Sequence, residues 1–388
     1  MEDFFRRLLD FLTLAQFSQA VLLIFILLVM DRNKKANIFF AAFLFILSSN
    51  FFSFFLFKYN IKILSTVFAS LALPGISIIG VFIYFYALSI TGLLEKIKPG
   101  HILHFIIYFV SLIFFFTVIH KAGGEPEPPA SIKNAIFVMM TIGLVNSILY
   151  VIYTTLILHR YYHKIENYYS DLEWMNLRWL GRIIPLSFLT LCIWCIGFWF
   201  AYLGIIPKSH LVIGLNITML IIIIFITANN VINQPEIFRQ NIEMVREIED
   251  PENSAGTEKY ARQSIDDRMQ DQYLEKLNSY MEEQKPYLSE NITIKDLAWE
   301  LDIPSHHLSI VINNRLNKNF YTFINEYRIK ESQEILKDPD NYEASILSIA
   351  FRAGFNSKST FNTTFKKITG LTPSEYRESM IPKSVLAG

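Results

Sequence analysis

Cysteine is nearly absent from this chain of 388 residues, which contains only Cys192 and Cys195. Two cysteines cannot supply the disulfide framework that holds small secreted domains together. Both lie in an apolar run, without a neighbouring cation that would stabilise a thiolate. We therefore interpret their C-x-x-C spacing as packing residues of a membrane helix and not as a redox pair.

Catalytic motifs are also missing. The sequence has no G-x-x-x-x-G-K-[ST] phosphate loop, no H-E-x-x-H zinc pair and no G-x-S-x-G nucleophile elbow. His306 and His307 are neighbours, but adjacent side chains on a helix point apart, and no cysteine or carboxylate completes a metal site. We expect no enzyme activity, no cofactor and no bound metal.

Net charge indicates no partner, because 35 Lys and Arg residues balance 35 Asp and Glu residues. The hydrophobic fraction of 52% exceeds the roughly 45 to 50% of ordinary soluble domains. Nearly all of this excess precedes Asn233, whereas charges recur every few residues from Gln234 to Gly388. Two regions of different chemistry are therefore expected.

Seven apolar runs approach or exceed the roughly 20 residues that cross a hydrocarbon core. None has Asp or Glu at mid-depth, where the charge relays of pumps and transporters lie. Their amides, hydroxyls and histidines are best explained by hydrogen bonds between helices. The polar residues in question are Asn50, Ser77, His104, Thr141, Asn146 and Asn216. The runs cover approximately 11–30, 36–57, 63–90, 101–119, 132–158, 183–206 and 210–232, and they predict a transmembrane helical domain over 1–232.

Residues 233–288 form an acidic connector with a Pro- and Gly-containing break near 251–256. Beyond the break, apolar residues recur at helical spacing and predict an amphipathic helix. This stripe either dimerises or packs on the domain that follows. It consists of Tyr273, Leu274, Leu277, Tyr280 and Met281.

Two similar helix-turn-helix patterns follow, at approximately 293–315 and 345–369. In the first, Thr293 and Asp296 form a capping box, and Ser305 is expected to cap the second helix. In the second, Gly354 stands where the tight turn needs a positive φ. Ala350, Phe355 and Phe361 correspond to Ala298, Ile303 and Leu308, with one extra residue in the second turn.

Residues 319–337 between the two patterns predict a single helix, on the order of 28 Å long at 1.5 Å per residue. A spacer of this length can present two recognition helices to major-groove segments about one DNA turn apart, roughly 34 Å. The fold class is therefore all-α: a polytopic bundle of about seven helices followed by a double helix-turn-helix domain over 289–380.

The second pattern resembles the AraC/XylS-type transcription regulators, and in particular their membrane-embedded members typical of Bacteroidota. The resemblance covers roughly the last hundred residues. It is carried by Ile349-Ala350, Gly354-Phe355, Phe361, Phe365-Lys366-Lys367, Gly370, Thr372-Pro373-Ser374 and Tyr376-Arg377, with Asn319-Phe320, Ile324-Asn325 and Tyr327-Arg328 in the spacer.

The resemblance implies that both units bind promoter DNA, usually to activate transcription. It places the first base-reading helix on His306, His307, Ser309, Ile310 and Asn313, and the second on Lys358, Ser359, Thr360, Asn362 and Thr363. Lys366 and Lys367 are suited to phosphate contacts, which fix register without reading sequence. The domain is not basic overall, so its electrostatic affinity for DNA should be modest.

We expect a one-component regulator that couples a signal at the membrane bundle to promoter binding. Two alternatives stay open: a passive bundle that only anchors the regulator, and a transporter-like protein with a regulatory tail. An inner-membrane, multi-pass location is expected, with the N-terminus outside and the C-terminal domain cytoplasmic, and the excess of Lys and Arg in the inner loops agrees weakly. Promoter DNA and the lipid bilayer are the expected partners, and RNA polymerase, a second copy of the chain and an unknown small ligand are further candidates.

Overall fold

The computed structural model describes residues 2–94, 97–122, 130–172, 178–202, 210–232 and 265–380. The chain divides into two compact units, one formed by Met1–His159 with Leu177–Phe238 and the other by Arg160–Asn176 with Arg239–Gly388. Every regular element of the described residues is a helix, which confirms the all-α class. The expected break at 251–256 and the rest of 233–264 lie outside the described residues.

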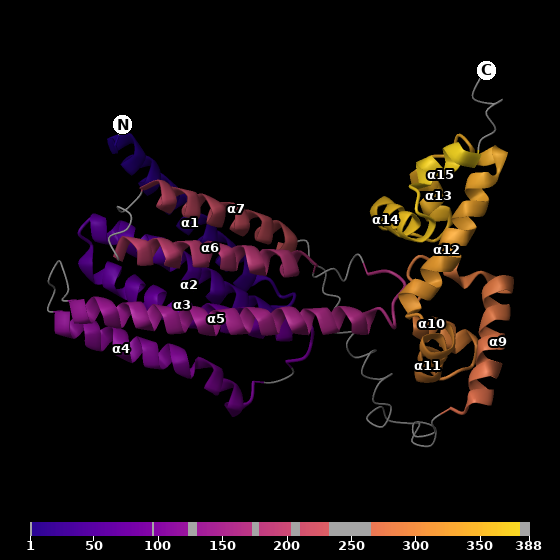
Figure 1. Cartoon of the computed structure of the whole chain (residues 1–388), viewed down its shortest axis with the longest axis horizontal. Helices are drawn as coiled ribbons and strands as arrows, with labels where there is room; N and C mark the ends of the chain where they lie inside the picture. The colour runs from indigo at the N-terminus through magenta and orange to yellow at the C-terminus, as the bar shows by residue number, and fades with distance from the viewer. Residues whose placement is uncertain are drawn as a thin grey trace. The chain divides into compact units, whose positions relative to one another are not determined.

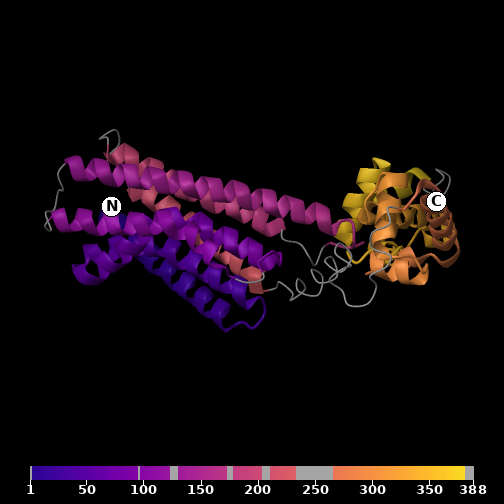
Figure 2. The same cartoon turned by 90° about the horizontal axis from the view of Figure 1, so that it is seen from below.

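The described residues of the N-terminal compact unit form a bundle of seven α-helices that lie side by side (Figures 1 and 2). The helices are α1 (Glu2–Val29), α2 (Lys34–Lys58), α3 (Lys62–Ile90), α4 (Ile106–Ala122), α5 (Ala130–Ile165), α6 (Arg178–Tyr202) and α7 (His210–Ile232), with a 3-10 helix η1 (Pro99–Phe105) before α4. Seven stretches of the described residues are long and apolar enough to cross a membrane, one in each helix except that the fourth, Pro99–Val118, combines η1 with most of α4.

Small and amide-bearing residues bring α3 and α5 into close contact. A Cβ on Gly80 would collide with the backbone of Ser147, and Ser147 Oγ donates to the carbonyl of Ile76 at 2.5 Å. Asn146 Nδ2 donates to Ser77 O at 2.8 Å. With few hydrophobic gains available between helices in lipid, close approach and hydrogen bonds of this kind hold membrane helices together.

Other polar residues of the bundle also bond between segments. Asn216 Nδ2 donates to Thr190 O at 3.3 Å, and His104 Nδ1 lies 2.5 Å from the Tyr150 hydroxyl. Thr141 instead bonds back to Phe137 within its own helix. Side chains of Asn146, Asn216 and His104 therefore bond between segments, whereas those of Ser77 and Thr141 bond within their own helices. Among the described residues Asn50 Oδ1 is buried without a partner, so the predicted hydrogen bonding between helices is confirmed for only part of the set. Both cysteines are free thiols.

The C-terminal helices belong to the other compact unit. They are α9 (Asp267–Gln284), η3 (Pro286–Leu288), α10 (Ile294–Glu300), α11 (Ser305–Leu316), α12 (Phe320–Lys337), η4 (Pro339–Asn341), α13 (Ile346–Arg352), α14 (Lys358–Thr369) and α15 (Pro373–Met380). Figure 1 shows α12 running from the α10–α11 pair to the group formed by α13, α14 and α15. The predicted spacer helix is confirmed, with Asn319 as its N-cap. Its 18 residues span about 27 Å.

The amphipathic stripe of α9 packs on its own domain. Leu277 and Met281 are fully buried, and α9 contacts α11 and η3. The Tyr273 ring stacks on His307 of α11 at 6.0 Å between centroids. Of the two interpretations of the stripe, packing on the following domain is the one that the structure shows, and it leaves Leu277 and Met281 unavailable to a second chain.

Candidate nucleic-acid interface

The first helix-turn-helix unit begins with the capping box predicted at Thr293. Thr293 Oγ1 accepts from the amide of Asp296, and the Asp296 carboxylate accepts from the amide of Thr293. These bonds satisfy amides that a helix start leaves unpaired. The expected cap at Ser305 is wrong: Pro304 occupies the N-cap of α11 and Ser305 is its first helical residue. Proline suits a position whose amide would have no helical partner.

The second unit has serine caps on both helices. Ser345 accepts from the amide of Ser348 at the start of α13, and Ser357 accepts from the amide of Thr360 at the start of α14. The predicted positive φ at Gly354 is confirmed at 88°. A side chain there would also collide with the carbonyl oxygen of Tyr287, so two separate constraints require glycine.

The turns of the two units are closed by the same hydrogen bond. The amide of Ile303 donates to Ala298 O at 3.0 Å, and the amide of Phe355 donates to Ala350 O at 2.9 Å. Asp302, with φ 50°, occupies the position that Gly354 takes in the second unit. The two units, which were expected to be similar from their sequences, therefore also have the same turn structure.

The extra residue of the second turn is Asn356. Ile303 is followed directly by the cap Pro304, whereas Phe355 is separated from the cap Ser357 by Asn356. Asn356 Nδ2 donates to Asn291 Oδ1 at 2.8 Å and to the carboxylate of Asp171. Through this inserted residue the start of α14 is hydrogen-bonded to Asp171 and Asn291, which lie outside the second helix-turn-helix unit.

One core joins α12 to the second unit. It includes several of the apolar residues that carried the family resemblance, and Phe361 lies edge-on to Phe365, which lies edge-on to Tyr376. Such aromatic pairs add stability beyond the area that they bury. The core consists of Ile329, Leu336, Ile349, Ala350, Ala353, Phe355, Phe361, Phe365 and Tyr376.

The candidate residues of α14 share its outer side. Lys358, Ser359 and Thr363 are exposed, as are Lys366 and Lys367, whereas Thr360 and Asn362 are half-buried. Phe361, Thr364 and Phe365 are buried on the opposite side. The three lysines make no ion pair within the described residues, so α14 offers cations together with hydroxyl and amide groups on one accessible surface.

The candidates on α11 are less uniformly placed. Ser309 and Ile310 are half-buried, and Asn313 Nδ2 donates to Ser309 O in its own helix. His307 is only 4% exposed, packed against Tyr273 and His306. Burial lowers the pKa of both histidines. His307 is therefore a neutral packing residue at pH 7, and we leave it out of the interface that we propose.

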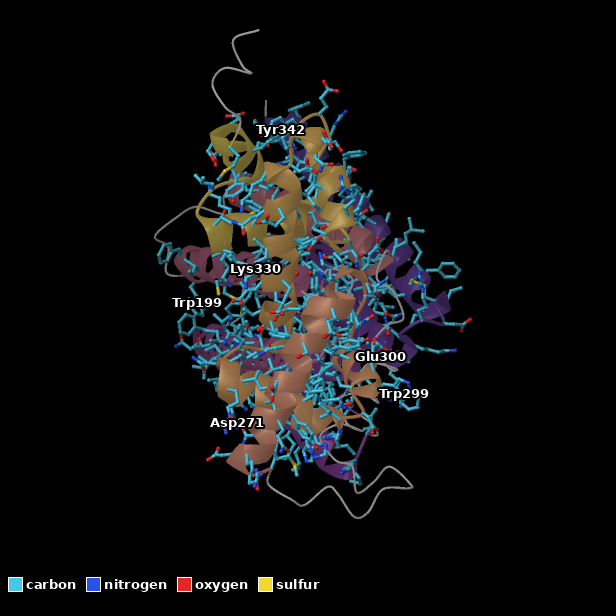
Figure 3. The ribbon with its side chains drawn as sticks, turned by 90° about the vertical axis from the view of Figure 1, so that its right-hand side faces the viewer. Trp199, Asp271, Trp299, Glu300, Lys330 and Tyr342 are labelled. Atoms are coloured by element: carbon cyan, nitrogen blue, oxygen red, sulfur yellow. The ribbon has the colours of Figure 1, made fainter. Side chains whose placement is uncertain are left out.

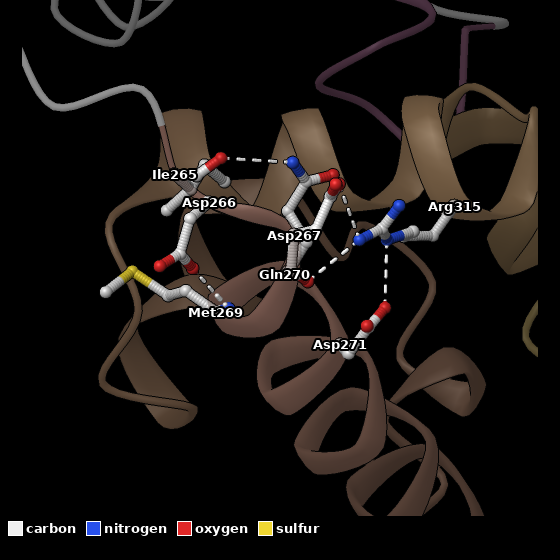
Figure 4. Close-up of polar contacts among 7 residues, drawn as sticks. All are labelled: Ile265, Asp266, Asp267, Met269, Gln270, Asp271 and Arg315. Atoms are coloured by element: carbon white, nitrogen blue, oxygen red, sulfur yellow. Dashed lines mark hydrogen bonds and ion pairs between the residues drawn. The ribbon is translucent and has the colours of Figure 1, made fainter.

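Arg315 near the end of α11 is paired with the acidic start of α9. Its guanidinium lies 2.9 Å from the Asp267 carboxylate and 3.0 Å from that of Asp271, as Figure 4 shows. Both carboxylates are largely exposed, so solvent weakens these ion pairs. The sequence showed the acidic connector but gave no signal that it would neutralise a cation of the first unit.

Trp299 on α10 is the most exposed large hydrophobic side chain among the described residues of the domain, at 85%. Figure 3 shows it projecting from the ribbon beside Glu300. Sequence reasoning did not single it out. Arg328 entered the sequence analysis only as part of the family resemblance, and its burial, at 1% exposed, was not predicted because an arginine in a helix is usually interpreted as a solvated side chain.

Comparison with known proteins relates the C-terminal helices to a domain family. A helix-turn-helix domain family matches residues 297–379. The melibiose operon regulatory protein of Escherichia coli (strain K12) is 30% identical over 103 residues, which are 26% of this chain and 33% of that protein. The raffinose operon transcriptional regulatory protein of Pediococcus pentosaceus is 30% identical over 98 residues, 24% of this chain and 34% of that protein.

An uncharacterized HTH-type transcriptional regulator of Bacillus subtilis is 28% identical over 89 residues, 23% of this chain and 30% of its own length. The chain thus spans about a third of the length of each of these three relatives. No solved structure matches it. Two helix-turn-helix units with the same turn, one spacer helix and these relatives agree: the C-terminal part of this chain is an AraC-type helix-turn-helix domain, the DNA-binding module of transcription regulators.

Proposed function

We propose that this protein is a membrane-bound, sequence-specific DNA-binding transcription regulator of the one-component kind. The observation that carries the proposal is the joining, in one chain, of seven helices with membrane-spanning length to an AraC-type domain. A signal at the bundle would then reach promoter DNA without a separate messenger protein.

The second unit supplies the better reading surface. On α14, Ser359, Thr360, Asn362 and Thr363 offer donors and acceptors to base edges, while Lys358, Lys366 and Lys367 suit phosphates. On α11, the candidates that we retain are His306, Ser309, Ile310 and Asn313. Because Arg315 is already paired with Asp267 and Asp271, the first unit contributes less charge to binding.

The C-terminal domain is proposed to lie in the cytoplasm, where DNA is found, with the bundle in the inner membrane. Residues 160–176, which comprise the end of α5 and the connection toward α6, belong to the same compact unit as the DNA-binding helices. This connection therefore lies on the same side as the domain. Five spans precede it, so the N-terminus would face the outside.

The test is a footprint of the full chain in membranes on a DNA duplex that the wild-type protein selects from a random-sequence pool. Replacing Lys358→Ala together with Thr360→Ala should weaken occupancy by at least tenfold, since a base contact and a phosphate contact are lost together. Lys330→Ala removes the same charge from the exposed side of α12 and is the matched control. Unchanged occupancy in the double variant would contradict the assignment of α14.

A further inference from the structure

Part of the connection between α5 and α6, residues 168–172, is buried, although loops normally run over a surface. Tyr168, Tyr169, Ser170, Asp171 and Leu172 are five consecutive buried residues, with Tyr169 only 3% exposed. We call residues 166–172 the docking segment. Burial of so many residues in sequence requires that their backbone polar groups find partners.

Those partners lie at the starts of two helices of the AraC-type domain. The amide of Ile294 donates to Tyr168 O at 3.0 Å and that of Ser170 to Ile292 O at 3.4 Å, which pairs Tyr169 with Thr293 in a short antiparallel bridge. The amide of Tyr321 donates to Glu166 O at 2.9 Å. The docking segment thus contacts the cap of α10 and the first turn of α12.

Arg328 of α12 fastens the segment to the domain from inside. Its guanidinium donates to the carbonyl of Ser170 at 3.4 Å and to the hydroxyl of Ser170 at 3.3 Å. The same group donates to the carbonyls of Tyr287, Ser289 and Glu290 at 2.8 to 3.1 Å. Burial lowers the pKa of Arg328 to about 10, so it stays charged at pH 7.

A buried cation is costly unless its donors are all occupied, and Ser170 occupies part of this set. Arg328 also lies over the Phe355 ring at 5.7 Å from its centroid. Phe355 belongs to the turn of the second helix-turn-helix unit. The side chain of Arg328 therefore links the spacer helix, on which it lies, to the docking segment and to that turn.

A second bond reaches the second unit directly. The carboxylate of Asp171 accepts from Asn356 Nδ2, the residue inserted immediately before the cap of α14. The docking segment therefore contacts the residues that precede α10 and α14, and the helix that separates the two units.

Resting on the function proposed above, we propose that the docking segment is a coupling element: it holds the two helix-turn-helix units in the one relative orientation that grips two neighbouring half-sites. Its docked state is the DNA-binding state. Because α5 runs without interruption to Ile165, the residue before the segment, a displacement of α5 along or about its axis changes the fit of Ser170 and Asp171. A change in the bundle can in this way alter DNA affinity.

Docking is tested by cross-linking the full chain in membranes. Tyr169 and Thr293 form the bridge pair that exchanges no hydrogen bond with each other, for which Cα atoms lie about 4.5 Å apart, within reach of a disulfide. With Cys192→Ala and Cys195→Ala in the background, Tyr169→Cys with Thr293→Cys should cross-link on mild oxidation. Tyr169→Cys with Ser345→Cys, at the equivalent cap of the second unit, should not. Equal or absent cross-linking in the two pairs would overturn docking.

Coupling is tested by DNA affinity of the full chain in nanodiscs, on the selected duplex and on the same duplex with one half-site scrambled. Removing an acid should on charge alone tighten DNA binding. We expect the opposite for Asp171→Ala, a loss of about tenfold on the intact duplex, the effect of one charge-assisted hydrogen bond. The loss on the scrambled duplex should be smaller, because a domain with uncoupled units loses mainly the benefit of the second half-site.

Asp340→Ala, which removes an exposed acid from η4, is the control and should bind as well as wild type or better. Asp171→Asn, which keeps an acceptor for Asn356, should recover part of the loss. If wild type binds the duplex and Asp171→Ala leaves the ratio between the two duplexes unchanged, the coupling element is wrong while the proposed function stands. If wild type selects no duplex, the proposed function fails and coupling falls with it.

Discussion

At the scale of single residues, the two positive-φ glycines of the second unit provide a controlled comparison. Gly354 and Gly370 have φ of 88° and 81°, values at which any L side chain is strained. A Cβ at Gly354 would meet the Tyr287 carbonyl, whereas nothing lies near a Cβ at Gly370. The two sites therefore separate the cost of backbone strain from the cost of a collision.

Gly370→Ala should destabilise the domain by about 1 kcal/mol, from the left-handed backbone alone. Gly354→Ala should cost about 3 kcal/mol, because η3 and the turn must also move apart. Hydrogen exchange of the α13 and α14 amides in the full chain measures both losses. Equal losses would show that Tyr287 does not constrain the turn.

The adjacent His306 and His307, half-buried and buried respectively, make the first helix-turn-helix unit sensitive to acid. Burial holds both pKa values below the 6.5 of an unfolded histidine, so the unfolded chain binds protons first as pH falls. The contribution to stability is complete above about pH 6.5 and is lost as pH decreases toward the folded pKa values. Exchange protection of α11 should therefore fall as pH decreases below about 6.5. Replacing His306→Gln and His307→Gln together should flatten this profile, and a profile that persists would assign it to other groups.

At the scale of elements, α9 and α11 are joined by ion pairs between acidic residues of α9 and Arg315 of α11. Asp271 lies 3.0 Å from the Arg315 guanidinium, so α9 holds a cation of the first unit that DNA phosphate could otherwise contact. α9 also closes the core of this unit through Leu277 and Met281. An acidic helix is thus an integral part of a domain that binds an anionic polymer.

Asp271→Asn should therefore tighten binding to the selected duplex by about threefold and steepen the dependence of affinity on salt, because one more cation becomes available to phosphate. Glu283→Gln removes the same charge at the other end of α9 and should change affinity less. Titrations at several salt concentrations distinguish the two variants. Weaker binding by Asp271→Asn would mean that the ion pair positions α11 and does not compete with DNA.

At the scale of the whole molecule, the connection between α5 and α6 belongs to the DNA-binding unit. Both must then occupy one compartment. Cysteine-accessibility labelling at Arg160 and a reporter fused after Gly388 should both indicate the cytoplasm, and a tag before Met1 should be accessible from outside. Opposite sides for the first two positions would contradict the docking segment as well as the topology.

Much of the architecture follows from local patterns along the chain. The seven apolar runs were enough to predict seven long helices, because helices of soluble domains do not need some 20 consecutive apolar residues. Thr293 with Asp296 and the positive φ of Gly354 were predictable because caps and turns depend on residues within four positions of each other. The resemblance to the AraC family, confirmed by comparison, likewise rests on residues contiguous in the chain.

What the tertiary structure decided are contacts between residues far apart in sequence. Only the folded structure shows that Tyr273 packs on the buried His307 and that Arg315 pairs with acidic residues of α9. It also shows that Arg328 and Asn356 donate hydrogen bonds to residues of the connection between α5 and α6. A periodic pattern reveals which residues avoid water but not which partner covers them, because burial depends on chain geometry over more than a hundred residues. For that reason the sequence by itself determined a set of seven apolar helices and two helix-turn-helix units, and the tertiary structure alone decided that residues from the connection between α5 and α6 pack on the helices of the C-terminal domain.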